Sequence, residues 1–406
     1  MIAMLLNRKR AEEKMSEYDL DALIATSAAN VFYTSDLNPF GNAFVLFPYE
    51  RDVEPALVAS ISGVTPITLS STPWISDVRY YGEFYTTTRF AEEPLSEAER
   101  RLISAQESWE REKERDPVEV LLRLLEERGL IKGRIGVDES NLPNGHPFWQ
   151  EIERKLPGLE VIKAQKVFRE IRMVKSNEEV RRIREALRIT EKAWGVALEH
   201  ASEGITEREF AEIYQRTIIS EGGRISSKGR FHGAPIGFGR RTAFVDIADP
   251  SDYKLRKGDI IRFDGGACYM GYPSDMARSA VLGEPSDKLQ RYFNAISEGE
   301  QLAIDMAKPG VKPSTIFKAA VEKVREAGIP HFERHHVGHG WGIEGYDPPL
   351  ISPYEHESLE EGMVLDFETP YYEVGWGGLM NEDVIVITSH EARYLTKFSR
   401  ELYVIK

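Results

Sequence analysis

The spacing of hydrophobic and polar residues in the first third of the chain predicts alternating strands and helices. A polar helix is expected over Asn7–Tyr18, and apolar residues three and four positions apart predict a second helix over Asp116–Leu130. A further apolar run lies at Asn30–Tyr33. Short apolar runs bounded by turn formers predict strands at Leu23–Thr26, Ala43–Pro48, Ala56–Ser60, Arg134–Asp138 and Leu159–Lys163. Together these elements predict a small α/β domain in which helices cover a sheet.

The pattern changes after the stretch Lys166–Ser176, which we take as the boundary between domains 1–165 and 166–406. Ser176 with Glu179 has the spacing of a capping box and predicts the start of a long helix, and Thr206 with Glu209 repeats that spacing. Further helices are expected at Ser286–Met306 and Pro313–Ala327. Strands are expected at Asp259–Phe263, Met276–Leu282, Gly362–Tyr371 and Asp383–Ile387.

Composition narrows the class of protein. A chain of 406 residues is long for one core, which favours two domains. The 52 basic and 66 acidic residues give a net charge of −14, which argues against nucleic acid or an anionic membrane as a partner. No apolar stretch is long enough to span a bilayer, and the start lacks the pattern of a signal peptide. The single cysteine, Cys268, excludes an intrachain disulfide and a zinc site built from cysteines, and it fits a cytoplasmic protein.

Three features in the second part of the chain suggest chemistry. Asp264 and Asp275 stand eleven positions apart around a glycine-rich turn, although aspartate is unfavourable in strands. His339 lies between glycines, which let a backbone or a ligand approach closely. Glu368 and Glu382 each lie in an apolar strand. Each has an ordinary structural explanation alone, but the joint occurrence favours a functional site.

A pair of metal ions would reconcile these residues. Four converging carboxylates repel one another and become protonated unless cations balance them. Two divalent ions supply that balance. One imidazole among four carboxylates favours hard ions such as Mn²⁺ or Co²⁺, with Zn²⁺ or Fe²⁺ as alternatives.

The same motifs resemble those of the pita-bread metallopeptidases, the family of methionine aminopeptidase, prolidase and aminopeptidase P. The segment Leu20–Tyr33 is similar to the creatinase/prolidase amino-terminal domain, and Arg172–Ser176 resembles the joint between the two domains of that family. The resemblance implies an α/β amino-terminal domain of this type, followed by an α+β pita-bread catalytic domain. It also implies a homodimer.

The resemblance assigns roles to the residues by motif. Asp264 and Asp275 would be the paired aspartates, with Asp275 and Glu382 bridging two metals, and His339 and Glu368 would complete the ligand set. A water or hydroxide between the metals would be the nucleophile, and Glu368 would act as general base and acid. His335, four residues before His339, matches the histidine that lines the substrate pocket. Its neighbour His336 either shares that role, lies behind the ligands, or is a surface residue.

The sequence departs from the family pattern at substrate-activating positions. One usual histidine is replaced by Ile247 or, with a one-residue gap, by Asp246, and another is replaced by Tyr346. Losing one donor to a developing negative charge typically lowers a rate by roughly 10²–10³. Tyr346 and the upstream His232 are therefore candidate substitutes.

A usual arginine is also absent from this chain, because Met380 stands at its position, two residues before Glu382.

Three functions remain open from the sequence. The first is a dinuclear metal hydrolase that cleaves Xaa-Pro bonds through a metal-bridging hydroxide. The second is a relative acting on another small molecule, similar to ectoine hydrolase or to a metal-dependent lyase. Creatinase itself has lost the metal ligands, so the complete set here argues against that activity. The third is a binding protein without catalysis, which would leave the five retained ligands unexplained.

Overall fold

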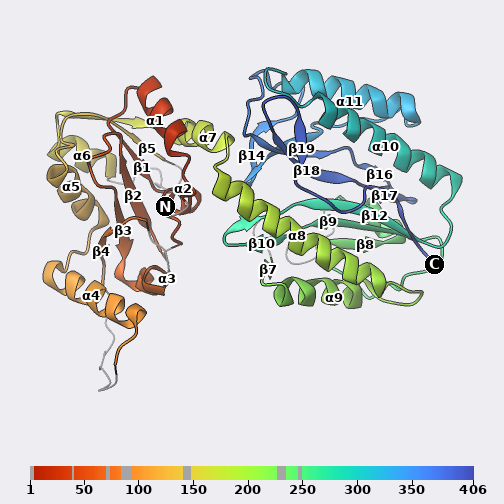
Figure 1. The fold of residues 1–406 in the computed structure, drawn as a ribbon, viewed down its shortest axis with the longest axis horizontal. Helices are drawn as coiled ribbons and strands as arrows, with labels where there is room; N and C mark the ends of the chain where they lie inside the picture. The colour runs from red at the N-terminus through yellow and green to blue at the C-terminus, as the bar shows by residue number, and fades with distance from the viewer. Residues whose placement is uncertain are drawn as a thin grey trace. The chain divides into compact units, whose positions relative to one another are not determined.

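The chain forms two compact units, each with its own hydrophobic core. The computed structural model describes residues 4–38, 41–69, 74–83, 94–139, 148–225, 235–245 and 249–406. Its contacts divide the chain into Met1–Arg172 and Met173–Lys406, and Figure 1 shows the fold of both. One buried apolar cluster belongs to each unit.

A six-stranded sheet forms the centre of the first unit, in the order β4-β3-β2-β1-β5-β6. β1 pairs antiparallel with β2 and parallel with β5, so the sheet is mixed. The five predicted strands are confirmed, and β4 is an additional one. The strands are β1 (Ala22–Ala25), β2 (Ala43–Pro48), β3 (Ala56–Ser60), β4 (Asp77–Tyr81), β5 (Gly133–Val137) and β6 (Leu159–Lys163).

Helix α5 (Pro117–Glu127) shows how the sequence covers this sheet. Its apolar residues Val118, Leu121 and Leu125 are buried in the core of the first unit. The Asp116 side chain caps the helix by accepting a hydrogen bond from the Val118 N–H at 2.9 Å. The other helices described in this unit are α1 (Arg8–Glu17), α2 (Ala28–Ser35), α3 (Val64–Leu69), α4 (Glu97–Glu112), α6 (Phe148–Lys155) and α7 (Gln165–Met173), with a 3₁₀ turn, η1, at Ile61–Gly63.

The second unit contains the two helices whose capping boxes were predicted. In α8 (Asn177–Glu199), the Ser176 side chain accepts from the Glu179 N–H, and the Glu179 carboxylate accepts from the Ser176 N–H. Thr206 and Glu209 make the same exchange at α9 (Glu207–Ser220). The later helices are α10 (Asp287–Met306) and α11 (Pro313–Ala327), with a 3₁₀ turn, η2, at Gly239–Ala243. No helix in the described ranges combines the length and apolar composition needed to cross a bilayer.

Most strands of the second unit belong to one large, mainly antiparallel sheet with the path β14-β13-β15-β18-β12-β9-β8. β19 pairs with β18, and β20 pairs with β12. These strands are β8 (Ile236–Phe238), β9 (Ile260–Gly265), β12 (Met276–Leu282), β13 (Gly338–Gly342), β14 (Gly345–Leu350), β15 (Val364–Glu368), β18 (Glu382–Ile387), β19 (Ala392–Tyr394) and β20 (Tyr403–Ile405). Small ladders join β7 (Arg224–Ile225), β10 (Ala267–Tyr269) and β11 (Tyr272–Pro273), and β16 (Tyr371–Glu373) with β17 (Gly377–Leu379).

Helices cover one side of the large sheet, which we call the helix face. Trp194 of α8 stacks on Phe263 of β9 with ring centroids 4.9 Å apart. Phe293 of α10 belongs to the same buried cluster as Phe367 of β15. Residues 264 and 368, next to these two phenylalanines in their strands, therefore point to the opposite face.

Candidate metal centre

Strand alternation gathers acidic residues on the face of the large sheet that is opposite the helix face. Asp264 lies opposite Ala277 in the pairing of β9 with β12, and Asp275 stands two residues before Ala277. Glu382 of β18 is also paired with Ala277. Opposed residues, and residues two apart in a strand, share a face of a sheet. The three carboxylates therefore point the same way, and we call this side the site face.

Strands β13 and β15 add further residues to the site face. Glu368 is paired with Glu382, and Asp366 is paired with His339. Asp366 and Glu368 are two residues apart in β15, so they share a side of the sheet. The site face thus carries all five residues that the motifs singled out, together with Asp366.

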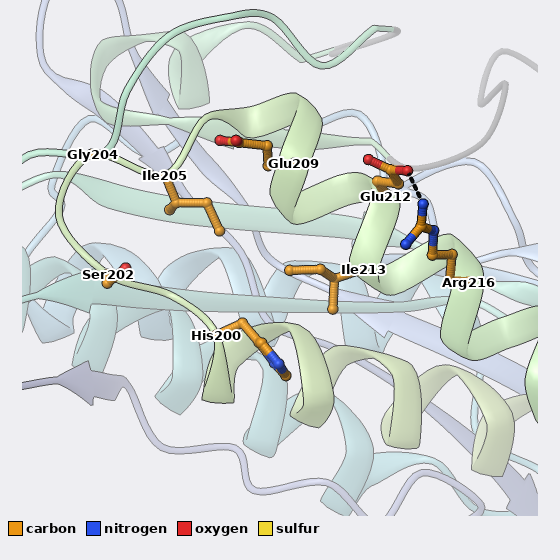
Figure 2. Close-up of a pocket in the computed structure, with 8 residues that line it drawn as sticks. All are labelled: His200, Ser202, Gly204, Ile205, Glu209, Glu212, Ile213 and Arg216. Carbon is orange, nitrogen blue, oxygen red and sulfur yellow. Dashed lines mark hydrogen bonds and ion pairs between the residues drawn. The ribbon is translucent and has the colours of Figure 1, made fainter.

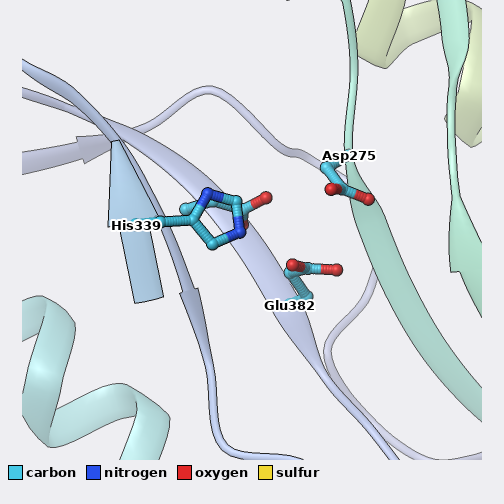
Figure 3. A group of neighbouring side chains, drawn as sticks. Asp275, His339 and Glu382 are labelled. Carbon is cyan, nitrogen blue, oxygen red and sulfur yellow. The ribbon is translucent and has the colours of Figure 1, made fainter. Parts of the chain in front are cut away.

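Four of these side chains converge closely enough to hold one metal ion. One ligand atom from each of Asp275, His339, Asp366 and Glu382 lies within 4.8 Å of the others, and all four residues are buried. Figure 3 shows Asp275, His339 and Glu382 approaching one another, His339 from β13, Glu382 from β18 and Asp275 from the residue before β12. Carboxylate oxygens and a neutral imidazole form a donor set that suits divalent ions.

Asp366 is the member of this group that the motifs missed. It is fully buried. Its position two residues before Glu368 in an apolar run was the available signal, because strand alternation places both side chains on one face. The family motif gave a ligand role to Glu368 but none to Asp366.

Charges on the site face are poorly balanced by the protein itself. Burial, with the charges of Asp264 and Glu368, raises the pKa of Asp275 well above its usual range. Burial and the charge of Asp275 likewise raise the pKa of Glu382 well above its usual range. One oxygen of Glu382 and both oxygens of Asp366 accept no hydrogen bond from an N–H or hydroxyl group of the described residues, and these two acids contact each other. Orphaned buried carboxylate oxygens of this kind fit a cation.

Two arginines approach the edges of the acidic group. Arg262 Nη1 lies 3.4 Å from Asp264 Oδ2 and 3.9 Å from Met380 Sδ. Arg334 Nη2 donates to Glu368 Oε2 at 3.0 Å. A guanidinium from β9 therefore lies beside Met380, the residue that replaces the family arginine.

His336 lies nearer to the acidic group than its sequence position suggested. It is buried, and its Nδ1 lies 3.3 Å from Glu368 Oε1. Burial lowers the pKa of His336 to about 3, so its ring is neutral. His335 is exposed, with its ring centroid 4.2 Å from that of His336. Of the alternatives for His336, a surface position is wrong.

Tyr346 stacks on the imidazole of His339, with ring centroids 3.7 Å apart and ring planes 19° apart. The site is open to solvent beside Tyr346, since 59% of this residue is exposed. Partial burial, followed by the charges of Glu368 and Glu382, raises the pKa of the Tyr346 hydroxyl. That hydroxyl stays protonated and can donate a hydrogen bond.

His232, and the positions Asp246 and Ile247, lie outside the described residues. The role suggested for His232 therefore stays a prediction.

Comparison with known proteins agrees with the motifs. Residues 181–389 match metallopeptidase family M24, and residues 7–174 match the creatinase/prolidase N-terminal domain. The chain belongs to metallopeptidase family M24. It is 28% identical over 396 residues to the Xaa-Pro dipeptidase of Pyrococcus horikoshii, and the match covers 97% of both chains. The predicted family and the predicted class, a metal-dependent hydrolase, are thereby confirmed.

Solved structures of M24 relatives share the fold over nearly the whole chain. The prolidase of Pyrococcus horikoshii OT3 superposes with a TM-score of 0.73 at 27% identity, covering 97% of this chain and 99% of that one. An X-Pro aminopeptidase from Thermotoga maritima gives a TM-score of 0.76 at 24% identity, with 98% and 99% coverage. The predicted fold, a creatinase-type unit followed by a pita-bread unit, is confirmed.

A hollow of about 500 Å³ lies in the second unit, at the end of α8 and along α9 (Figure 2). Its polar groups are already engaged: Glu212 pairs with Arg216 at 2.6 Å, and Glu209 belongs to the helix cap. The hollow contains none of the residues that the motifs identify. It is lined by His200, Ser202, Gly204, Ile205, Glu209, Glu212, Ile213 and Arg216.

Proposed function

We propose that this M24 protein is a dinuclear metal-dependent hydrolase that cleaves an Xaa-Pro-type peptide bond. The observation that carries the proposal is the buried group of carboxylates and one imidazole on the site face. The name of the Pyrococcus horikoshii relative, which matches over 97% of this chain, supports the choice of substrate.

Five residues would hold the two divalent ions. They are Asp264, Asp275, His339, Glu368 and Glu382, and Mn²⁺ or Co²⁺ fits their oxygen-rich set. His339 can serve as a neutral ligand, because burial lowers its pKa to about 4. When bound, two such ions would lower the pKa of a shared water and so supply the nucleophile.

Glu368 would move the protons of the reaction. Burial raises the pKa of Glu368 to about 7, and Arg334 opposes this rise. A carboxylate placed beside the water can take a proton from it and pass that proton to the leaving nitrogen. Arg334 and His336 contact its two oxygens and would fix its orientation.

Tyr346 would stabilise negative charge on the substrate carbonyl oxygen. Its ring rests on His339, next to the acidic group, and its hydroxyl retains the proton to donate. His335, exposed beside His336, would line the substrate pocket.

A second function is favoured by the changes at the substrate-activating positions. Tyr346 and Met380 replace a histidine and an arginine of the family pattern, while the acidic group remains complete. A small-molecule amidohydrolase or lyase would keep the metals and alter these residues. The homodimer and the cytoplasmic location also stay predictions.

Turnover of defined substrates separates the two functions. Purified protein loaded with Mn²⁺ or Co²⁺ is assayed on Xaa-Pro dipeptides, longer Xaa-Pro peptides and small cyclic or acyclic amides. The proposal expects metal-dependent release of proline or of a proline-leading peptide. Turnover restricted to non-peptide amides would replace it with the second function.

A further inference from the structure

We infer that Asp366 is a direct ligand of the metal position formed by Asp275, His339 and Glu382. The inference rests on the proposed metal site and adds a ligand that the five-residue motif does not contain. It makes this position the more negative of the two, and therefore the one that fills first.

Strand pairing brings Asp366 to this position. Asp366 of β15 lies directly opposite His339 of β13. Opposed residues in antiparallel strands have Cβ atoms about 4.5–5.5 Å apart. A carboxylate and an imidazole at that separation, on one face, can share an ion held between them.

The Asp366 carboxylate lacks the contacts that a structural role would supply. Its exposure is 0%, and its oxygens meet Glu382, another acid of the same group, while no N–H or hydroxyl of the described residues donates to them. A buried carboxylate of this kind costs several kcal/mol unless a cation compensates it. Asp383, on the opposite side of the same sheet, shows the contrast, because Arg278 Nη2 donates to its Oδ1 at 2.6 Å.

The distribution of arginines makes the two metal positions unequal. Asp264 and Glu368 each have a guanidinium within 3.4 Å. Within the described ranges, no lysine or arginine forms an ion pair with Asp275, Asp366 or Glu382. These three acids surround His339. Asp275 and Glu382 would bridge both ions, so the two positions differ in their other acids. Arg262 lies beside Asp264, whereas no lysine or arginine of the described residues pairs with Asp366, so a divalent ion is favoured at the position that contains Asp366.

Calorimetric titration with Mn²⁺ tests the inference on the full chain. Protein stripped with EDTA and dialysed is titrated as wild type, as Asp366→Asn, and as the control Asp252→Asn. Asp252 undergoes the same chemical change in the same unit, but its side chain is 82% exposed and pairs with Arg208. We expect Asp366→Asn to weaken the tighter binding step by at least about 10-fold, as loss of a metal-supporting group typically does. The control is expected to match wild type.

Thermal unfolding in EDTA distinguishes a ligand from a structural residue. Removing one carboxylate from a crowded acidic group relieves repulsion when no metal is present. Metal-free Asp366→Asn is therefore expected to unfold at the same temperature as wild type or at a higher one. Weaker Mn²⁺ binding together with a lower unfolding temperature in EDTA would show a structural role and overturn the inference.

The outcomes also separate this inference from the proposed function. If wild type takes up two Mn²⁺ ions and Asp366→Asn binds them equally well, Asp366 is not a ligand while the dinuclear site stands. A single tight Mn²⁺ site that Asp366→Asn weakens would support the inference and contradict the dinuclear proposal. Wild type without any Mn²⁺ binding would overturn both.

Discussion

Glu382 and Asp383 are neighbours in strand β18, yet their negative charges have different surroundings. Asp383 points to the helix face, where Arg278 lies 2.6 Å and Arg400 2.7 Å from its oxygens. Glu382 points to the site face, where the charges of Asp275 and Asp366 lie close to it and no lysine or arginine of the described residues forms an ion pair with it. One strand thus carries a compensated acid and an uncompensated acid side by side.

The difference separates structural acids from candidate metal ligands. Removing one partner of a buried ion pair is costly, so a carboxylate held by two arginines belongs to the fold. A buried carboxylate that the fold leaves without a counter-charge needs an ion or a proton from outside. Burial alone does not distinguish the two clusters, because both are almost completely enclosed. The placement of arginines distinguishes the two clusters.

The largest expected effect is on catalysis at the site face. Glu368→Gln removes the proposed general base, and rates should fall by roughly 10²–10⁴. The measurement is kcat on an Xaa-Pro dipeptide in saturating Mn²⁺. Glu401→Gln, at an exposed position, is the control and should leave kcat unchanged. Retained activity in Glu368→Gln would remove Glu368 from the proton transfer.

The next effect is on stability at the helix face. Arg278→Met leaves Asp383 without one of its two arginines, and the free energy of unfolding should fall by about 3–5 kcal/mol. Urea unfolding of metal-saturated protein measures this. As a control, Arg208→Met removes an exposed ion pair with Asp252 and should cost less than about 1 kcal/mol. Equal losses in both variants would contradict the contrast between compensated and exposed charges.

A pH effect of intermediate size is expected from Glu300, which lies 3.0 Å from Arg400 on the helix face. Burial, with the charge of Asp383, raises the pKa of Glu300 from 4.5 to about 8. Between these values the folded chain holds a proton that the unfolded chain has released. The stability contribution of Glu300 is therefore fully present below pH 4.5 and declines as the pH rises to about 8.

Glu300→Gln should remove that decline, which a rise of the pKa from 4.5 to about 8 puts at up to roughly 5 kcal/mol. Urea unfolding at a series of pH values, with wild type and variant both saturated with metal, isolates the contribution of this residue. Identical pH profiles in the two proteins would show that Glu300 is ionised in the folded state.

The smallest effect is expected on the site face, and its sign is opposite to that on the helix face. In EDTA, Asp275→Asn should raise the free energy of unfolding by about 1 kcal/mol, since it relieves repulsion among carboxylates. Asp383→Asn should lower it under the same conditions, because it breaks the pairs with Arg278 and Arg400. Thermal unfolding of both variants checks the signs. A loss of stability in both would mean that the site face is also internally compensated.

The sequence predicted the elements of this fold well where its signals are local. The caps at Ser176 and Thr206 and the short apolar runs of the strands depend on residues within a few positions of one another. The apolar run Asn30–Tyr33 shows the limit of composition alone. It lies in helix α2, where the Ser27 side chain accepts from the Asn30 N–H at 3.2 Å.

The sequence predicted only those site residues that belong to a recognisable motif. Spacing identified Asp264, Asp275, His339, Glu368 and Glu382, and all five share one face of the sheet. Arg262 and Arg334 could not be found this way, because their contacts depend on which strands and loops lie next to one another. The excess charge around Asp366 likewise becomes visible only when β13, β15 and β18 are placed side by side.

Metal content after equilibration with Mn²⁺ tests the central claim most directly. Wild type, Asp275→Asn and Asp383→Asn are loaded with Mn²⁺, freed of unbound ion by gel filtration, and analysed by mass spectrometry for manganese per folded chain. We expect two ions in wild type and in Asp383→Asn, and fewer in Asp275→Asn. Wild type without bound manganese, or equal binding in all three proteins, would contradict the assignment of the site face as the metal centre.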